Sequence, residues 1–320
     1  MTAKTWKSIL VAVRDPGARK QVALTKAAAI ASRTGARLTL FHAFSSPVPL
    51  PSPVPSNPRA ILSKVAAYHR GRLQELAKPL RRRGIKVTCE AVWDFPPAHA
   101  IVRRVLQSPP DLVIAESHRH MQLARWFLAN SDWELIRECP CPVWFVKREQ
   151  LPGKSLVLAA VDPSHAHAKP AALDDRLLRA ASAVTDQLGG RVAMLHVRDA
   201  AWSEPQLRSS GTPIAAASAE SIARLAARHQ VDMDLCLMRK GVPARHIVST
   251  VSEFDVDLLV MGAVSRGSAG HAPIGNTAEA VLDEVGCDVL VVKPRNFRTS
   301  VTRKRPSLGP LTASRSRSAP

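Results

Sequence analysis

The 320-residue sequence contains no apolar run that approaches the ~18 residues of a membrane-spanning helix, so no such span is expected. Its first residues lead directly into a predicted strand and lack the apolar core and cleavage site of a signal peptide. Cysteine is scarce, and its five residues are an odd number with irregular spacing. That usage favours a reducing compartment over a disulfide framework. We therefore predict a cytoplasmic protein.

Acidic residues are scarce and unevenly distributed. Residues 1–149 contain 24 Lys or Arg against 10 Asp or Glu, hence +14, whereas residues 150–297 contain 15 against 16. Residues 298–320 contain six Lys or Arg, no acid and few large apolar side chains, which predicts a basic disordered tail. The excess charge fits nucleic acid or an anionic membrane surface as partner. No nucleic-acid motif accompanies it, so a solubilising surface is the favoured interpretation.

The apolar pattern predicts alternating strands and helices in two successive copies. A chain of this length predicts about two domains, here residues 1–149 and 150–297. Buried-strand runs fall at residues 9–13, 38–44, 85–93, 111–115 and 143–146, and again at 156–161, 192–197, 235–238, 258–261 and 289–292. Helical spacing separates most of these runs, and the six prolines of residues 45–58 predict an extended excursion. Such alternation implies parallel sheets covered on both faces.

The duplication can be checked by overlaying residues 111–147 on residues 257–293 without a gap. Asp111 then falls on Asp257, Asn130 on Asn276, and Cys141 on Cys287. The copy at 257–293 consists of a strand, a glycine-containing loop, a helix and a second strand. In open α/β sheets, ligands bind at the carboxyl ends of strands, beside such loops and helix N-termini.

The loop of the second copy carries a spaced motif of Gly262, Ser265, Gly275 and Asn276, followed by Thr277. With it, the duplicated chain resembles a tandem universal stress protein over residues 9–294. The residues 275–279 (GNTAE), Asp132-Trp133, and 139–144 (CPCPVW) are most similar to the universal stress protein E subgroup. The resemblance implies two doubly wound, flavodoxin-like domains, each with a five-stranded parallel sheet. It also implies that strands 143–146 and 289–292 pair, which makes an intrachain pseudo-dimer.

The resemblance implies a site for ATP or a related nucleotide, expected in the second half only. Gly262 would let a phosphate approach the strand end, while the amides of Gly275, Asn276 and Thr277 begin a helix and suit an anion. The Thr277 hydroxyl could add a bond. By resemblance, Asp162 and Val197 would face the adenine and Arg266 would reach phosphates. No metal is expected other than Mg²⁺ with a nucleotide.

Three departures from the family motif leave alternatives open. Ser265 replaces the second motif glycine, and in the first half Glu116 stands in place of Gly262 and Ala129 in place of Gly275. We expect a stress-response module whose ligand biases the loop at residues 262–275 for an unknown protein partner. The alternative is a nucleotide-free scaffold that acts through protein contacts or a small apolar ligand. Slow ATP hydrolysis or autophosphorylation is a third reading, although no base, nucleophile and orienting group occur together at the loop.

Overall fold

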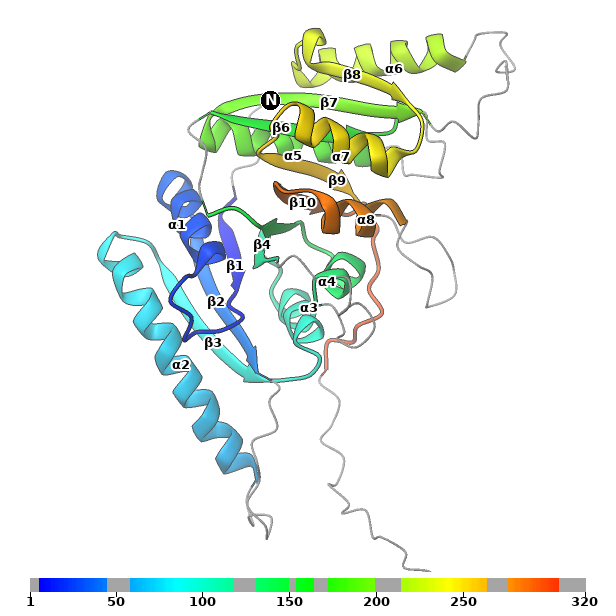
Figure 1. Ribbon diagram of the computed structural model, residues 1–320. Coiled ribbons are helices and arrows are strands. Elements are labelled where there is room, and N and C mark those ends of the chain that lie inside the picture. The colour runs from blue at the N-terminus through cyan, green and yellow to red at the C-terminus, as the bar shows by residue number, and fades with distance from the viewer. Residues whose placement is uncertain are drawn as a thin grey trace, which may run out of the picture.

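The computed structural model describes residues 6–44, 58–117, 131–149, 154–163, 172–198, 214–263 and 276–304. These residues form one continuous ten-stranded sheet in the order β3-β2-β1-β4-β5-β10-β9-β6-β7-β8 (Figure 1). Within the described part of the chain, no helix is long and apolar enough to cross a membrane.

The first half contributes five strands and four helices. They are β1 (Ser8–Ala12), α1 (Val22–Thr34), β2 (Arg37–Phe44), α2 (Pro58–Arg82), β3 (Val87–Trp93), α3 (Pro97–Gln107), β4 (Leu112–Glu116), α4 (Ser131–Glu138) and β5 (Val143–Val146). The central strands are buried on both faces, as the four buried residues of β4 and of β5 show. Their continuous apolar runs are typical of parallel sheets covered by helices.

The second half repeats this order. Its elements are β6 (Ser155–Val161), α5 (Ala172–Leu188), β7 (Gly190–Arg198), α6 (Ile214–His229), β8 (Cys236–Lys240), α7 (Pro243–Glu253), β9 (Leu258–Gly262), α8 (Asn276–Glu284) and β10 (Asp288–Val292). All pairs within each half are parallel. The prediction of two doubly wound α/β domains in tandem is therefore confirmed. The strand order in each half, 3-2-1-4-5, matches the first five strands of the Rossmann arrangement.

The two halves meet through the last strand of each, which we call the junction (β5 and β10). Leu290 lies opposite Trp144, with Val289 opposite Phe145, in the only antiparallel pairing among the described strands. This confirms the pairing across the halves that the family resemblance implied. Trp144 is 2% exposed, and its ring packs edge-on against that of Trp6, with the two ring centres 6.2 Å apart. Trp144 therefore packs in the interior of the junction.

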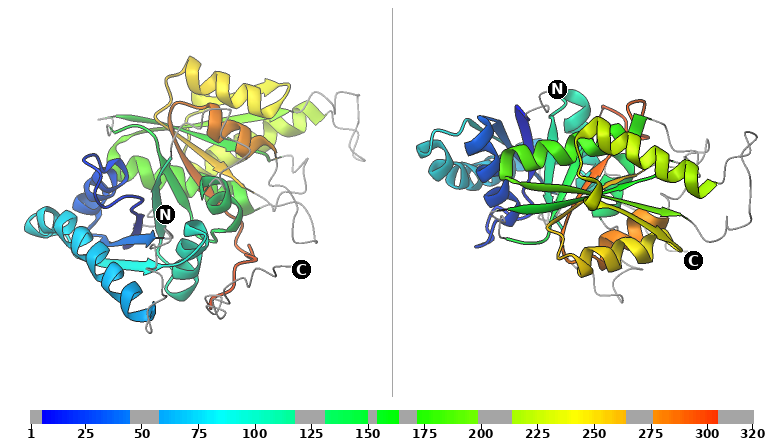
Figure 2. Two further views of the ribbon diagram at one scale, coloured as in Figure 1. Left: turned by 60° about the horizontal axis from the view of Figure 1, so that its bottom comes forward. Right: turned by 90° about the horizontal axis from the view of Figure 1, so that it is seen from above.

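Helices cover both faces of the sheet, and each covering layer runs through both halves (Figure 2). One apolar core joins α1, α2, α5 and α6 to the sheet, and the other joins α3, α4, α7 and α8 to its opposite face. Helices α1 and α5 contact one another across the junction. The halves therefore share their cores as well as their backbone ladder.

Helix α2 contains an internal proline, and the segment after β10 contacts the first half. Helix α2 continues through Pro79 to Arg82, and Gly84 then adopts a left-handed conformation with φ of 82°. The segment predicted as a tail begins with residues that contact the first half, since the Thr299 hydroxyl donates to Glu138 at 2.6 Å and Val301 is buried. Residues 305–320 and the proline-rich segment 45–57 lie outside the described residues.

Candidate functional site

The carboxyl ends of β6 and β9 form the point in the second half where the strand order reverses. The chain leaves β6 toward β7 on one side and leaves β9 toward β10 on the other. Ala160 of β6 pairs with Met261 of β9, so Asp162 and Gly262 lie within two residues of the same rung. A crevice outside such strand ends is the usual ligand position in open α/β sheets.

Four of the predicted site residues can be placed on these elements. Gly262 ends β9, is half-buried and pairs with Val292 of β10. Asp162 directly follows β6, and the half-buried Val197 lies near the end of the neighbouring strand β7. Thr277 is the second residue of α8. These residues thus lie at the ends of three adjacent strands and at the start of the helix that follows β9.

The other predicted site residues belong to the loop before α8 and to its first residue. Ser265, Arg266 and Gly275 lie outside the described residues, and Asn276 is described only as the first residue of α8. In the described part of the chain, no group of three or more His, Cys, Asp or Glu side chains could hold a metal ion.

Asp174 is a residue of this site that the sequence did not reveal. It lies in the first turn of α5, is 2% exposed, and its Oδ1 accepts a hydrogen bond from the Asp162 backbone N–H at 3.1 Å. The contact fixes the backbone immediately after β6. Its signal in the sequence is only an acidic residue near a helix start, which is too common to identify a contact 12 residues away.

A histidine at the end of the second strand of each half was also missed. His42 of β2 donates from Nδ1 to the carbonyl of Val13 at 2.8 Å, and His196 of β7 makes the same contact with Val161 at 3.3 Å. Burial lowers the pKa of His42. The histidines tie the second strand to the first at the carboxyl edge, and the overlay of the halves could have identified them as a repeated pair.

The first half differs from the second at the start of its last helix. Asp132, in the first turn of α4, is 6% exposed and accepts a hydrogen bond from the Ser117 hydroxyl at 2.8 Å. The equivalent residues of the second half are Ala278 and Ala263, both buried. The backbone is the same in both, because Ser117 N–H donates to Val146 and Ala263 N–H donates to Val292. The first half therefore has a buried carboxylate at this position and the second half has none there. The first turn of α8 instead carries Glu279 at the next position, which pairs with Arg137 of the first half at 3.3 Å.

A hollow of about 90 Å³ lies at the carboxyl end of β1 in the first half. Its lining includes Asp15, Lys20, Gln21 and Glu116, the residue that replaces the motif glycine. Sites for drug-sized ligands typically measure roughly 300–1,000 Å³. The hollow is thus small for a nucleotide, and it carries a carboxylate at the place where a phosphate would lie.

These observations define a class of protein: a tandem pair of doubly wound α/β domains, joined through their last strands, with strand-end sites that have diverged. The sequence model of the Universal stress protein family matches residues 5–147 and again residues 157–293. The chain belongs to the universal stress protein family and contains two copies of its domain.

Full-length relatives share this tandem organisation. The chain is 28% identical to Universal stress protein E of Escherichia coli strain K12 over 317 residues, which cover 92% of this chain and 96% of the relative. A crystal structure titled as a putative universal stress protein from Pseudomonas aeruginosa UCBPP-PA14 superposes with a TM-score of 0.72 at 24% identity, covering 90% of this chain and 94% of that one. A protein of Pseudomonas aeruginosa PAO1, titled functionally unknown protein PA1789, also gives 0.72 at 25% identity, with coverages of 90% and 93%.

Proposed function

We propose that this protein is a cytoplasmic stress-response module that binds ATP or a related nucleotide in its second half. The ligand would bias the loop at residues 262–275, and a protein partner would bind that surface. A ligand shifts such a loop only by its differential affinity for the two loop states. The five cysteines are all free thiols, which fits a reducing compartment.

The observation that carries the proposal is the replacement of the buried Asp132 of the first half by Ala278 at the start of α8. In the first half, Asp132 supplies its own negative charge to the N-terminus of α4. In the second half, Ala278 and Ala263 supply none, and the Glu279 carboxylate of the same turn pairs with Arg137, so the N-terminus of α8 would favour an external anion such as a phosphate. Gly262 adds a strand end without a side chain beside it.

The predicted site residues would bind different parts of the nucleotide. The start of α8 and the Thr277 hydroxyl would hold phosphates, with Arg266, Ser265 and Gly275 contributing from the loop. Asp162, held by Asp174, and Val197 would lie against the base. Binding and orientation are the proposed roles, and no catalytic group is assigned.

The test transfers the carboxylate of the first half into the second. ATP is titrated calorimetrically into the wild type and into Ala263→Ser/Ala278→Asp. The variant should bind ATP at least about tenfold more weakly, equivalent to 1.4 kcal/mol, because its carboxylate would repel the phosphates. The matched control, Ser117→Ala/Asp132→Ala in the first half, should retain wild-type affinity, and thermal melting checks that each variant is folded.

Two results would count against the nucleotide site. An absence of ATP binding by the wild type would favour the nucleotide-free scaffold. Equal ATP binding by the wild type and by Ala263→Ser/Ala278→Asp would place any nucleotide away from the start of α8.

A further inference from the structure

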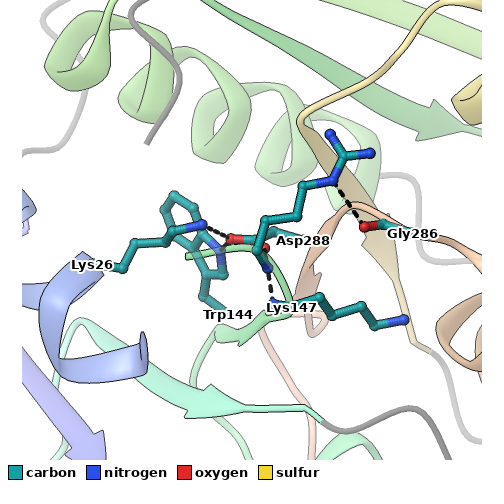
Figure 3. A network of polar contacts seen from close by, with 6 residues as sticks. Lys26, Trp144, Lys147, Gly286 and Asp288 are labelled. Atoms are coloured by element: carbon teal, nitrogen blue, oxygen red, sulfur yellow. Dashed lines mark hydrogen bonds and ion pairs between the residues drawn. The ribbon is translucent and has the colours of Figure 1, made fainter. Parts of the chain in front are cut away.

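A buried charged cluster at the junction surrounds Asp288, the first residue of β10 (Figure 3). Asp288 is 1% exposed. Its Oδ2 accepts hydrogen bonds from Lys26 Nζ at 2.5 Å and Trp144 Nε1 at 2.8 Å. Its Oδ1 accepts the backbone N–H groups of Lys147 at 2.9 Å and Arg148 at 3.0 Å. All four donors belong to the first half, whereas the carboxylate belongs to the second.

The duplicated fold shows which residues stand at the equivalent places in the other half. The overlay of 111–147 on 257–293 continues to 148 and 294, and helices α1 and α5 align through Gly35 and Gly189, which follow them. The equivalences are Lys26 with Ala180, Trp144 with Leu290, Lys147 with Lys293, Arg148 with Pro294, and Pro142 with Asp288. Three of the four donors therefore have no counterpart in the second half, because Ala180, Leu290 and Pro294 cannot donate from these positions.

Pairing of like halves would leave charges without partners. If two second halves met through β10, Asp288 would keep one of its four donors, the N–H of Lys293. If two first halves met through β5, the ammonium of Lys26, whose side chain is 3% exposed here, would face Pro142 in place of a carboxylate. A buried charge that loses its partner is strongly destabilising, because its desolvation is no longer compensated.

We propose that the Asp288 cluster makes the junction selective, so that each half accepts only a half of the other kind. The partner of the second half must supply an ammonium on its first helix, an indole N–H on its last strand, and two backbone N–H donors after that strand. The first half of the same chain meets these requirements. A second copy meets them only by exchanging halves, so like halves do not associate through this surface.

The test allows the separated halves to pair in any combination. A protease site replaces residues 150–153, the folded full-length protein is cleaved there, and the cleaved halves are unfolded in urea and refolded together. Native mass spectrometry then counts mixed and like pairs, which differ in mass. The wild type should give mixed and like pairs in a ratio of at least about 10:1, a tenfold excess over the 1:1 ratio of the statistical 1:2:1 distribution. Lys26→Leu/Asp288→Leu, which removes both charges, should move toward that distribution.

An exposed ion pair between the halves provides the matched control. Arg137 and Glu279 lie 3.3 Å apart with side chains 44% and 27% exposed, so Arg137→Gln/Glu279→Gln should keep the wild-type excess. Asp288→Asn, which removes the carboxylate charge alone, should lower the excess of mixed over like pairs. This variant replaces Lys26→Leu/Asp288→Leu in the test if the leucine variant does not refold. Statistical pairing or unpaired halves from the wild type would overturn the proposal. So would undiminished selectivity in both Asp288 variants.

Discussion

At the residue scale, two equivalent lysines cross the junction to the last helix of the opposite half. Lys147 Nζ donates to the carbonyls of Leu282 and, at 2.8 Å, Val285 near the end of α8. Lys293 Nζ lies 3.5 Å from the Arg137 carbonyl near the end of α4 and 4.2 Å from the centre of the Phe297 ring. A cation is favourable at a helix C-terminus, so each lysine ties its own half to the other.

Lys293→Met should stabilise the protein at pH 7. Lys293 is 1% exposed, and burial lowers the pKa of its ammonium from 10.5 to about 8. At pH 7 the folded state therefore carries a poorly solvated charge, and its removal should raise the free energy of unfolding by about 1–3 kcal/mol. Between pH 8 and 10.5 the unfolded chain binds more protons, so wild-type stability should rise with pH there while that of the variant does not.

Urea denaturation at pH 7 and at pH 9.5 measures both effects. Lys147→Met is the control, and it should lose stability at pH 7 because Lys147 holds two helix carbonyls. A Lys293→Met variant less stable than the wild type at pH 7 would mean that the Arg137 carbonyl and the Phe297 ring compensate the buried charge.

At the element scale, the sequence predicted what depends on local pattern. The apolar run of β9 and the Asn276-Thr277 start of α8 were both confirmed, since burial and helix initiation follow from neighbouring residues. The Ser117–Asp132 bond and the contact between Asp174 and the Asp162 backbone N–H were missed, because each joins groups 12 or more residues apart in the chain. The charges around Asp288 were missed for the same reason, since Lys26 lies 262 residues away.

The segment after β10 is an element that neither periodicity nor composition indicated. Glu138, the last residue of α4, accepts hydrogen bonds from the Thr299 hydroxyl at 2.6 Å, the Ser300 N–H at 2.8 Å and the Ser300 hydroxyl at 2.9 Å. Val301 is then buried in the apolar core that contains α3, α4, α7 and α8. Burial alone would raise the pKa of Glu138, but these hydrogen bonds bring it below its usual value.

Glu138→Gln should loosen this segment while leaving the sheet intact. An amide cannot accept all three bonds with the strength of a carboxylate, so hydrogen exchange at the amides of Ser300 and Val301 should accelerate by about tenfold. Because the pKa of Glu138 is lowered, its contribution is present above the ordinary pKa of 4.5 and is lost as the pH falls through the folded value. The equivalent Glu284→Gln in α8, where Glu284 is exposed, is the control and should leave this exchange unchanged.

At the scale of the whole molecule, the halves form one body because both apolar layers and the strand ladder pass through the junction. The outer strands are less protected than the centre. The strands β3 and β8 end the sheet and carry the half-buried Cys89 and Cys236, whereas Cys139, Cys141 and Cys287 are buried beside the junction. The five thiols therefore lie at positions that range from the edges of the sheet to its centre, and their reactivity reports on opening at each position.

Thiol alkylation in moderate urea should show whether the halves unfold together. Burial raises the pKa of Cys139 to about 12 and that of Cys287 to about 11, so neither thiol should react until the core opens. Cys89 and Cys236 should react on the order of tenfold faster, through local opening at the sheet edges. If the junction makes one cooperative unit, Cys139, Cys141 and Cys287 should react at equal rates, measured by peptide mass spectrometry and normalised to the fully unfolded chain. A Cys287 rate that differs by about tenfold from those of Cys139 and Cys141 would mean that each half opens alone, despite the shared cores.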